Sequence, residues 1–377
     1  MYTKKKQYGR ARRGVLETAH GSIETPFFMP IATRGAVKSL ASEDVLDLGA
    51  QIVLSNTYHL LLRPGSEGMR QLGGLHSFMN WSGPILTDSG GYQVYSLGKI
   101  RTIDEDGVSF QSHIDGSKIR LTPEGSMAMQ SSIGSDIIMQ FDDVAPGDSP
   151  RARYEEAMER SLLWAKRCKD SYDASQKLFA IVQGGTHEDL RRRSAEELVK
   201  IGFDGYAIGG LSVGESREDT FRITKFLCEL LPEDAPRYFM GGGMPEEIVY
   251  YVSVGVDMFD CVLPTRNARH GTLFIWKGDP STVVANAFEL AQDGASDDRI
   301  REAMYEKVQV TRERFAFDIS HIDDFNNTVP TSQTYTKAYL RHLFKINDLL
   351  AFRLATQQNL GFYMRLMKEL REVLSRS

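Results

Sequence analysis

Three aspartates that each end a short apolar segment are the residues best suited to chemistry. Asp88 follows Ile85–Thr87, Asp142 follows residues 137–141, and Asp260 ends an apolar run that begins at residue 256. Carboxylates that meet at one site suit a reaction in which one attacks or stabilises a cationic carbon while another moves a proton. Glycosyl transfer has this form because its transition state resembles an oxocarbenium ion. A single Asp after a strand is more often a helix N-cap, so the prediction depends on the three lying together, with Asp260 as the centre of the chemistry.

A second group of residues could recognise a flat polar base. Gln183 ends a fourth apolar segment, and an amide beside a carboxylate can pair with donor and acceptor edges of such a base. Tyr92 and Met240 could contact its two faces, although each alone is more typical of packing. The glycines at 90 and 91 would let the backbone approach a ligand closely.

Two basic clusters are visible despite a net charge of -5, which argues against a general nucleic-acid coat protein. Arg266 and Arg269 lie within ten residues of Asp260, where we expect phosphate contacts and not only a solvated loop. Residues 4–13 hold three lysines and three arginines, which could form a solvated tail or contact nucleic acid.

No metal or cofactor is expected from the residue spacing. The three cysteines are far apart in sequence, no histidine pair has metal-ligand spacing, and His59 and His270 are expected to be structural or loop residues. No apolar stretch approaches the roughly 18 residues of a membrane span, and the basic N-terminus lacks a signal-peptide core. We therefore expect a cytoplasmic protein with no membrane contact.

The candidate residues follow strands that alternate with helical segments, which predicts a (β/α)8 TIM barrel. The expected strands are 27–33, 51–55, 84–88, 136–143, 178–183, 205–210, 237–243 and 256–260. In such barrels the active site lies at the carboxyl ends of the strands. A doubly wound open sheet also alternates strands and helices, but would not so readily end every strand in polar or glycine-rich residues. Residues 94–122 carry two Asp-Gly turns and are expected to form an antiparallel insertion.

The pattern changes after the eighth strand. We expect a TIM-barrel catalytic domain over residues 1–276 and an appended subdomain over 277–377 whose helices pack on the barrel. The sequence predicts one more strand at 272–276, just before this boundary. After it, we expect a charged helix at 297–308 and a polar loop at 318–332. Three helices are expected to close the chain, at 335–344, 346–356 and 360–374.

Five segments resemble those of the tRNA-guanine transglycosylases. They are SNTYHL at 55–60, TDSGGYQ at 87–93, VQGG at 182–185, GGLSVGE at 209–215 and FDCVLPTRNARHG at 259–271, and they occur in the family's order. The resemblance implies a TIM barrel that exchanges guanine at the wobble position of tRNAs with GUN anticodons for a 7-deazaguanine base. Its partners would be the tRNA anticodon loop, guanine and the incoming base.

The same resemblance implies a role for each candidate residue. Asp260 would attack the ribose carbon to give a covalent tRNA intermediate, and Asp88 would handle the proton of the departing and incoming base. Arg266 and Arg269 fall where the family contacts the anticodon-loop backbone. The residues that would recognise the base are Ser89, Asp142, Gln183, Gly210 and Leu211, with Tyr92 and Met240 stacking on it.

The sequence departs from the family at its zinc site, normally Cys-x-Cys-x-x-Cys and a later His. The corresponding positions hold Asn327, Val329, Ser332 and Gln358, so we predict that no metal is bound.

Smaller features bear on the base and on assembly. Val213 resembles the bacterial pattern that accepts 7-aminomethyl-7-deazaguanine (preQ1), whereas Val144 occupies a position where bacterial members often carry Cys and queuine-using members carry Val; we expect preQ1 as the incoming base. Four residues resemble the family's homodimer contacts, which implies a homodimer, although aromatic residues at helical spacing are more often core: Phe78, Tyr335, Tyr339 and His342. The alternatives are a queuine-using or DNA-acting transglycosylase and a non-catalytic tRNA-binding subunit.

Overall fold

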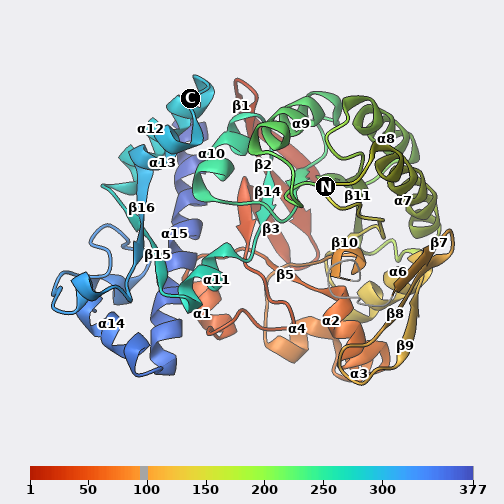
Figure 1. Ribbon diagram of the computed structural model, residues 1–377. Helices are drawn as coiled ribbons and strands as arrows, with labels where there is room; N and C mark the ends of the chain where they lie inside the picture. Colours follow the sequence, from red (N-terminus) through yellow and green to blue (C-terminus); the bar gives the residue numbers. More distant parts are fainter. Residues whose placement is uncertain (94–100, 377) are drawn as a thin grey trace.

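The computed structural model describes residues 1–93 and 101–376, and its centre is a barrel of eight parallel strands (Figure 1). In spatial order the strands are β4 (Phe27–Met29), β14 (Met258–Asp260), β13 (Arg237–Phe239), β12 (Gly205–Ile208), β11 (Lys177–Val182), β10 (Ile137–Met139), β6 (Ile85–Thr87) and β5 (Val53–Ser55). A parallel bridge between Ile31 and Leu54 joins β4 to β5 and closes the ring. The barrel prediction is therefore confirmed, and the open-sheet alternative is wrong.

The barrel interior is filled by side chains from alternate strand positions, as in other barrels of this size. The interior cluster includes Phe27, Met29, Ile52, Leu54, Leu86, Ile137, Met139, Phe179, Ile181, Ala207, Tyr238 and Met258. This packing makes the barrel a solid core, so a ligand can bind only at one of its two ends.

Helices cover the outside of the barrel because one face of each is apolar. The longer ones are α6 (Pro123–Ile133), α7 (Arg151–Ser171), α8 (Glu188–Ile201), α9 (Arg217–Leu230) and α10 (Pro245–Ser253). The shorter ones are α1 (Ser42–Asp47), α2 (Thr57–Leu62), α3 (Gly65–Gln71) and α4 (Gly74–Met79). Within residues 1–93 and 101–376, no helix combines the length and apolarity that crossing a membrane requires.

The basic N-terminus is a folded sheet and not a solvated tail. Strands β1 (Tyr2–Tyr8), β2 (Ala11–Thr18) and β3 (Gly21–Thr25) form an antiparallel sheet against the amino ends of the barrel strands. Arg12 and Tyr2 both donate to Asp257, just before β14, and Lys4 pairs with Glu233 at 2.6 Å. Tyr2 packs into the barrel interior, a long-range contact that the charged residues after it in the sequence do not reveal.

A buried aspartate anchors this sheet to the barrel. Asp136, at the amino end of β10, accepts the backbone N–H groups of His20 and Ile85 at 3.0 and 2.9 Å. The stacked rings of His20 and His76 contact the same carboxylate at 2.9 and 3.3 Å. Burial alone would raise the pKa of Asp136, but these donors outweigh it and lower the pKa to about 2. Both carboxylate oxygens of Asp136 thus already accept hydrogen bonds, and these contacts attach the β2–β3 turn to the barrel.

An antiparallel sheet interrupts the barrel after β6, as the Asp-Gly turns predict. It consists of β7 (Arg101–Asp104), β8 (Gly107–Gln111) and β9 (Lys118–Leu121). The first seven residues of the predicted insertion, 94–100, lie outside the described residues.

The C-terminal part is built on an antiparallel pair of strands and one long helix (Figure 1). Its elements are α11 (Leu263–Arg269), β15 (Thr272–Trp276), α12 (Pro280–Gln292), α13 (Asp297–Met304), β16 (Tyr305–Gln309), α14 (Lys337–Lys345) and α15 (Leu349–Arg376). The helix predicted at 297–308 ends at Met304, because residues 305–309 pair with β15.

The separate helices predicted at 346–356 and 360–374 are wrong, since α15 runs through both. Polar residues between the two predicted helices face inward and find partners. Gln358 donates to the carbonyl of Phe274 at 2.7 Å, and Asn359 donates to those of Pro264 and Thr272 at 3.0 and 2.9 Å. Tertiary contacts therefore keep this polar turn helical.

Candidate active site

A cavity of about 360 Å³ lies at the carboxyl ends of the barrel strands. Its lining includes eight of the residues proposed from sequence: Asp88, Ser89, Tyr92, Asp142, Gly210, Leu211, Met240 and Asp260. Gln183 lies behind this lining and donates to Asp142 at 2.7 Å. The two arginines, Arg266 and Arg269, are not part of the lining.

Asp260 is the last residue of β14 and is held by one carboxylate oxygen. Its Oδ1 accepts the Tyr238 hydroxyl at 2.5 Å and the Gly241 backbone N–H at 2.9 Å. No described residue donates to Oδ2, which leaves that oxygen available to a ligand. Burial raises the pKa of Asp260, and the two donors partly offset the rise.

Asp88 follows β6 and contacts the start of a neighbouring helix. Its Oδ1 accepts the backbone N–H groups of Thr57 and Gly90 at 2.9 and 3.2 Å, and the Asn56 amide donates to Oδ2. The N-cap alternative is thus partly right, because Thr57 is the first residue of α2. The pKa of Asp88 is nevertheless raised to about 6. Burial is the main cause, the charge of Asp260 adds to the rise, and the hydrogen-bond donors partly offset it. A carboxyl with this pKa can give or take a proton near neutrality.

Asp142 follows β10 and is part of a side-chain network within the cavity. It accepts the Ser89 hydroxyl at 3.1 Å and the Gln183 amide at 2.7 Å. Burial raises the pKa of Asp142 to about 6, against the effect of both donors. A carboxylate and an amide joined in this way present adjacent acceptor and donor groups, the arrangement predicted for reading a base edge.

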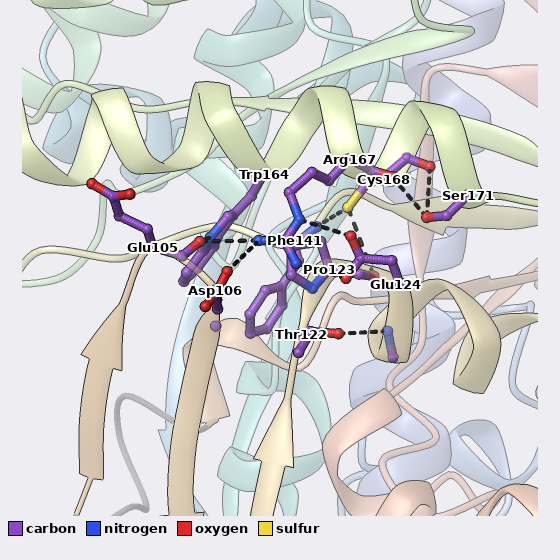
Figure 2. A network of polar contacts seen from close by, with 12 residues as sticks. Glu105, Asp106, Thr122, Pro123, Glu124, Phe141, Trp164, Arg167, Cys168 and Ser171 are labelled. Carbon is purple, nitrogen blue, oxygen red and sulfur yellow. Dashed lines mark hydrogen bonds and ion pairs between the residues drawn. The ribbon is translucent and has the colours of Figure 1, made fainter.

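Residues on both sides of Asp142 fix the backbone that carries it. Phe141 stacks on Trp164 of α7, and its N–H contacts the Cys168 sulfur at 3.3 Å (Figure 2). On the other side, the buried Asp143 carboxylate pairs with Arg153 and Arg160, also on α7. Asp142 is therefore held between two anchored neighbours.

The same face of α7 also holds the antiparallel insertion. Trp164 and Arg167 donate to the carbonyl of Glu105 at 2.7 and 3.1 Å, and Arg167 pairs with Glu124 of α6 at 2.7 Å (Figure 2). The insertion is thus tied to the helix that supports Asp142.

The two residues expected to contact the faces of the base differ in exposure. Tyr92 is 49% exposed, and Met240 is half-buried against the interior cluster. Both line the cavity, which is consistent with contact to the faces of a planar ligand.

The two arginines predicted to bind phosphate lie on α11, a short helix that begins three residues after Asp260. Arg266 is exposed, while Arg269 is half-buried and donates to the carbonyl of Thr265 at 2.8 Å. Burial and the neighbouring Arg266 lower the pKa of Arg269. Two adjacent cations beside the cavity mouth can contact an anionic backbone.

The sequence interpretation missed several residues of the site. Tyr238 and Asn56 donate to the two key carboxylates, and His59, expected to be structural, lines the cavity. Burial, with Arg34, His113 and Lys38, lowers the pKa of His59 to about 4, so its imidazole is neutral near pH 7. A buried tyrosine needs a hydrogen-bond partner, and this signal could have drawn attention to Tyr238.

The arrangement suits substitution at a sugar carbon. Two carboxylates with raised pKa values, one of them with an oxygen that accepts no hydrogen bond from a described residue, can divide the tasks of nucleophile and acid. The apolar and glycine-rich remainder of the cavity leaves room for a flat ligand between them.

Comparison with known proteins agrees with this geometry. The family model described as queuine tRNA-ribosyltransferase matches residues 7–377. Proteins named queuine tRNA-ribosyltransferase from Tolumonas auensis and Caldanaerobacter subterraneus are each 48% identical over 373 residues, which covers 98% of this chain and 92% of theirs. The corresponding protein from Fusobacterium nucleatum is 46% identical over 370 residues, or 97% of this chain and 91% of its own. The chain therefore belongs to the queuine tRNA-ribosyltransferase family of pentosyltransferases.

Proposed function

We propose that this enzyme exchanges guanine at the wobble position of tRNAs with GUN anticodons for a 7-deazaguanine, through a covalent Asp260–ribosyl intermediate. The observation that carries the proposal is the pairing of Asp260 and Asp88 in one cavity. Asp260 has a buried carboxylate with one oxygen fixed by Tyr238 and Gly241, and Asp88 has a pKa near 6.

In the first half of the reaction, Asp260 Oδ2 forms a bond to the anomeric carbon of the target nucleotide. The carbon–nitrogen bond to guanine breaks at the same time, and the base leaves with that electron pair and a proton from Asp88. In the second half, the incoming base loses its proton to Asp88, attacks the same carbon and releases Asp260. The protein regains its starting state, so no cofactor is needed.

Base recognition is assigned to the network around Asp142. Ser89 and Gln183 orient its carboxylate, and the backbone at Gly210 and Leu211 lines the cavity beside it. Tyr92 and Met240 would stack on the base. Because the target nucleotide must leave the anticodon stack to reach this cavity, Arg266 and Arg269 would hold the flanking phosphates.

We assign preQ1, and not the bulkier queuine, as the incoming base. Val144 and Val213 both line the cavity, on loops that touch each other. A Cβ atom at Gly147 would lie 2.6 Å from the carbonyl oxygen of Val213, so the two loops pack closely. This contact limits the space next to the base position and favours a small substituent.

The test is incorporation of radiolabelled guanine into a tRNA with a GUN anticodon. We expect label in that tRNA and none in a tRNA whose wobble base is not guanine. With unlabelled competitors, preQ1 should inhibit at lower concentration than queuine. Stronger inhibition by queuine would reverse the assignment of the base, and absence of label with folded, tRNA-binding protein would refute the exchange reaction itself.

We also propose that the C-terminal part lacks the zinc ion expected from the family resemblance, because the side chains present do not fit it. Asn327 is exposed and accepts from Arg365 at 2.8 Å, and Val329 packs on Gly361. Gln358 donates to buried Asp323 at 2.9 Å. Neither amides nor a valine supply the thiolates or imidazole that zinc prefers.

The buried hydrogen bonds around Asp323 make the connection that a metal would otherwise provide. Asp323 is 1% exposed and accepts the backbone N–H groups of Trp276 and Phe325 at 3.1 and 3.0 Å. With Gln358 these contacts link the 323–329 segment to β15 and α15. The subdomain can thus keep its shape without zinc.

We further propose a homodimer that uses aromatic residues of two separate elements, Tyr335 and Tyr339 near the start of α14 and Phe78 on α4. Tyr335 and Tyr339 stack with ring centres 5.4 Å apart, and Tyr339 and Phe78 are 40% and 47% exposed. Native mass spectrometry tests both proposals together. We expect a species of twice the 42.4 kDa chain mass with no bound zinc. A monomer would refute the dimer. The His76→Ala variant removes a side chain from the His20–His76–Asp136 cluster, the other group among the described residues that could hold a metal. One zinc per chain that persists in this variant would refute the zinc-free subdomain.

A further inference from the structure

Arg191, on the first turns of α8, is a buried cation without an acidic partner. Its side chain is 0% exposed, and no salt bridge to it exists among residues 1–93 and 101–376. Burial lowers the pKa of Arg191 to about 9, although the charges of Glu215 and Tyr154 oppose the change. A buried charge with no acidic partner is costly unless other groups compensate it, so the contacts of the guanidinium are informative.

The guanidinium instead binds carbonyl oxygens from two loops. On the β11 side, Arg191 donates to the carbonyls of Val182 at 2.6 Å and Gly185 at 2.7 Å. On the β12 side, it donates to those of Gly209 at 2.7 Å and Gly210 at 3.4 Å. Its planar fork therefore links the ends of two adjacent barrel strands.

These two loops carry the residues assigned to base recognition. Gln183 lies between the two carbonyls on the β11 side, and Gly210 lines the cavity. The Gln183 side chain and Gly210 are packed closely, because a Cβ atom at Gly210 would lie 2.2 Å from Gln183 Oε1. Any change in the separation of the loops would thus move the Gln183 amide relative to Gly210.

The backbone of both loops is shaped to offer its carbonyls to Arg191. Gly184, Gly185 and Gly210 have φ angles of 137°, 58° and 61°, which favour glycine. Helix α8 adds a second contact one turn later, where the Ser194 hydroxyl accepts the backbone N–H of Gln183 at 3.2 Å. One helix face thus fixes both sides of Gln183.

We propose that Arg191 is a positioning residue of the base pocket: it sets the spacing of the β11 and β12 loops so that Gln183, Asp142 and Gly210 meet the base together. This inference rests on the proposed function, in which those residues read the base. Lysine cannot replace the fork, because a single ammonium cannot span four carbonyls on two loops.

The experiment compares Arg191→Lys and Arg191→Gln with Arg237→Gln as a matched control. Arg237 is also buried, at 6% exposure, and also binds backbone carbonyls, those of Leu231 and Gly255, but at the amino end of β13. KM for guanine and KM for tRNA are measured separately, with the melting temperature of each variant.

We expect KM for guanine to rise on the order of tenfold in Arg191→Lys and further in Arg191→Gln, since small displacements at a binding site cost this much. KM for tRNA should stay near the wild-type value. Arg237→Gln should lower the melting temperature and leave KM for guanine unchanged. An unchanged KM for guanine in the Arg191 variants, or an equal rise in Arg237→Gln, would overturn the proposal.

Two further measurements keep the outcome unambiguous. If Arg191→Gln does not fold, Ser194→Ala takes its place, because this change removes only the contact to the Gln183 N–H. An unaltered KM for guanine in both Ser194→Ala and Arg191→Lys would then refute positioning by α8. Calorimetric titration with guanine measures the pocket without turnover. A wild type that binds guanine but incorporates no label would refute the proposed reaction, while the titrations of the variants still decide the role of Arg191.

Discussion

Replacing Asp260 with asparagine is expected to reduce guanine exchange by at least about 10³-fold, a loss typical of removing a covalent nucleophile. The variant keeps the size of the side chain and an oxygen that can accept the Tyr238 and Gly241 donors now on Oδ1. It loses the negative oxygen that forms the bond to ribose. Its affinity for tRNA should remain close to that of the wild type, because Arg266 and Arg269 are unchanged.

The covalent intermediate gives a direct readout of this loss. Wild-type protein incubated with tRNA should yield a protein–tRNA adduct that survives denaturing electrophoresis, and Asp260→Asn should yield none. A gel-shift assay on the same samples checks that tRNA still binds. An adduct of normal yield in the asparagine variant would show that another residue is the nucleophile.

The barrel and most of its mouth could be predicted because strand ends carry a local signal. Each of Asp88, Asp142 and Asp260 directly follows an apolar segment, and parallel strands must bring such ends to one rim. The helices α8 and α9 carry a local signal of the same kind, because both begin with acidic residues in the first turn and bury apolar residues at regular spacing. Local patterns of this kind need no knowledge of distant contacts.

The residues that could not be predicted depend on contacts across long stretches of chain. The partners of Asp260 and Asp88, Tyr238 and Asn56, lie 22 and 32 positions away. The β15–β16 pairing overrides a helical pattern, and α15 continues through Gln358 because that side chain bonds to Phe274, 84 residues earlier. In each case tertiary hydrogen bonds override local propensity.

The second large expected effect is the pH dependence of folding stability that the raised pKa of Asp88 causes. Its pKa is about 6 in the folded protein against 3.8 as the ordinary value, so the folded state binds the proton more tightly than the unfolded state. The contribution of Asp88 to stability should therefore fall as pH rises from about 4 to 6, and stay at the lower level above that range. This pKa difference corresponds to a loss of at most about 3 kcal/mol.

Asp88→Asn cannot ionise and should escape this loss while abolishing exchange. Urea unfolding of both proteins between pH 4 and 7.5 would show the stability of the variant, relative to wild type, rising by up to about 3 kcal/mol over this range. Any constant effect of the altered bonds to Asn56 and Thr57 would shift the whole curve without changing its slope. The exposed Asp104, whose pKa is lowered to about 2 by Arg120, is the matched control: its titration lies between about pH 2 and 4, so Asp104→Asn should show almost no change relative to wild type between pH 4 and 7.5. A difference between wild type and Asp88→Asn that stays flat with pH would mean that Asp88 is ionised at an ordinary pKa, and that the proton of the base must be carried by another group.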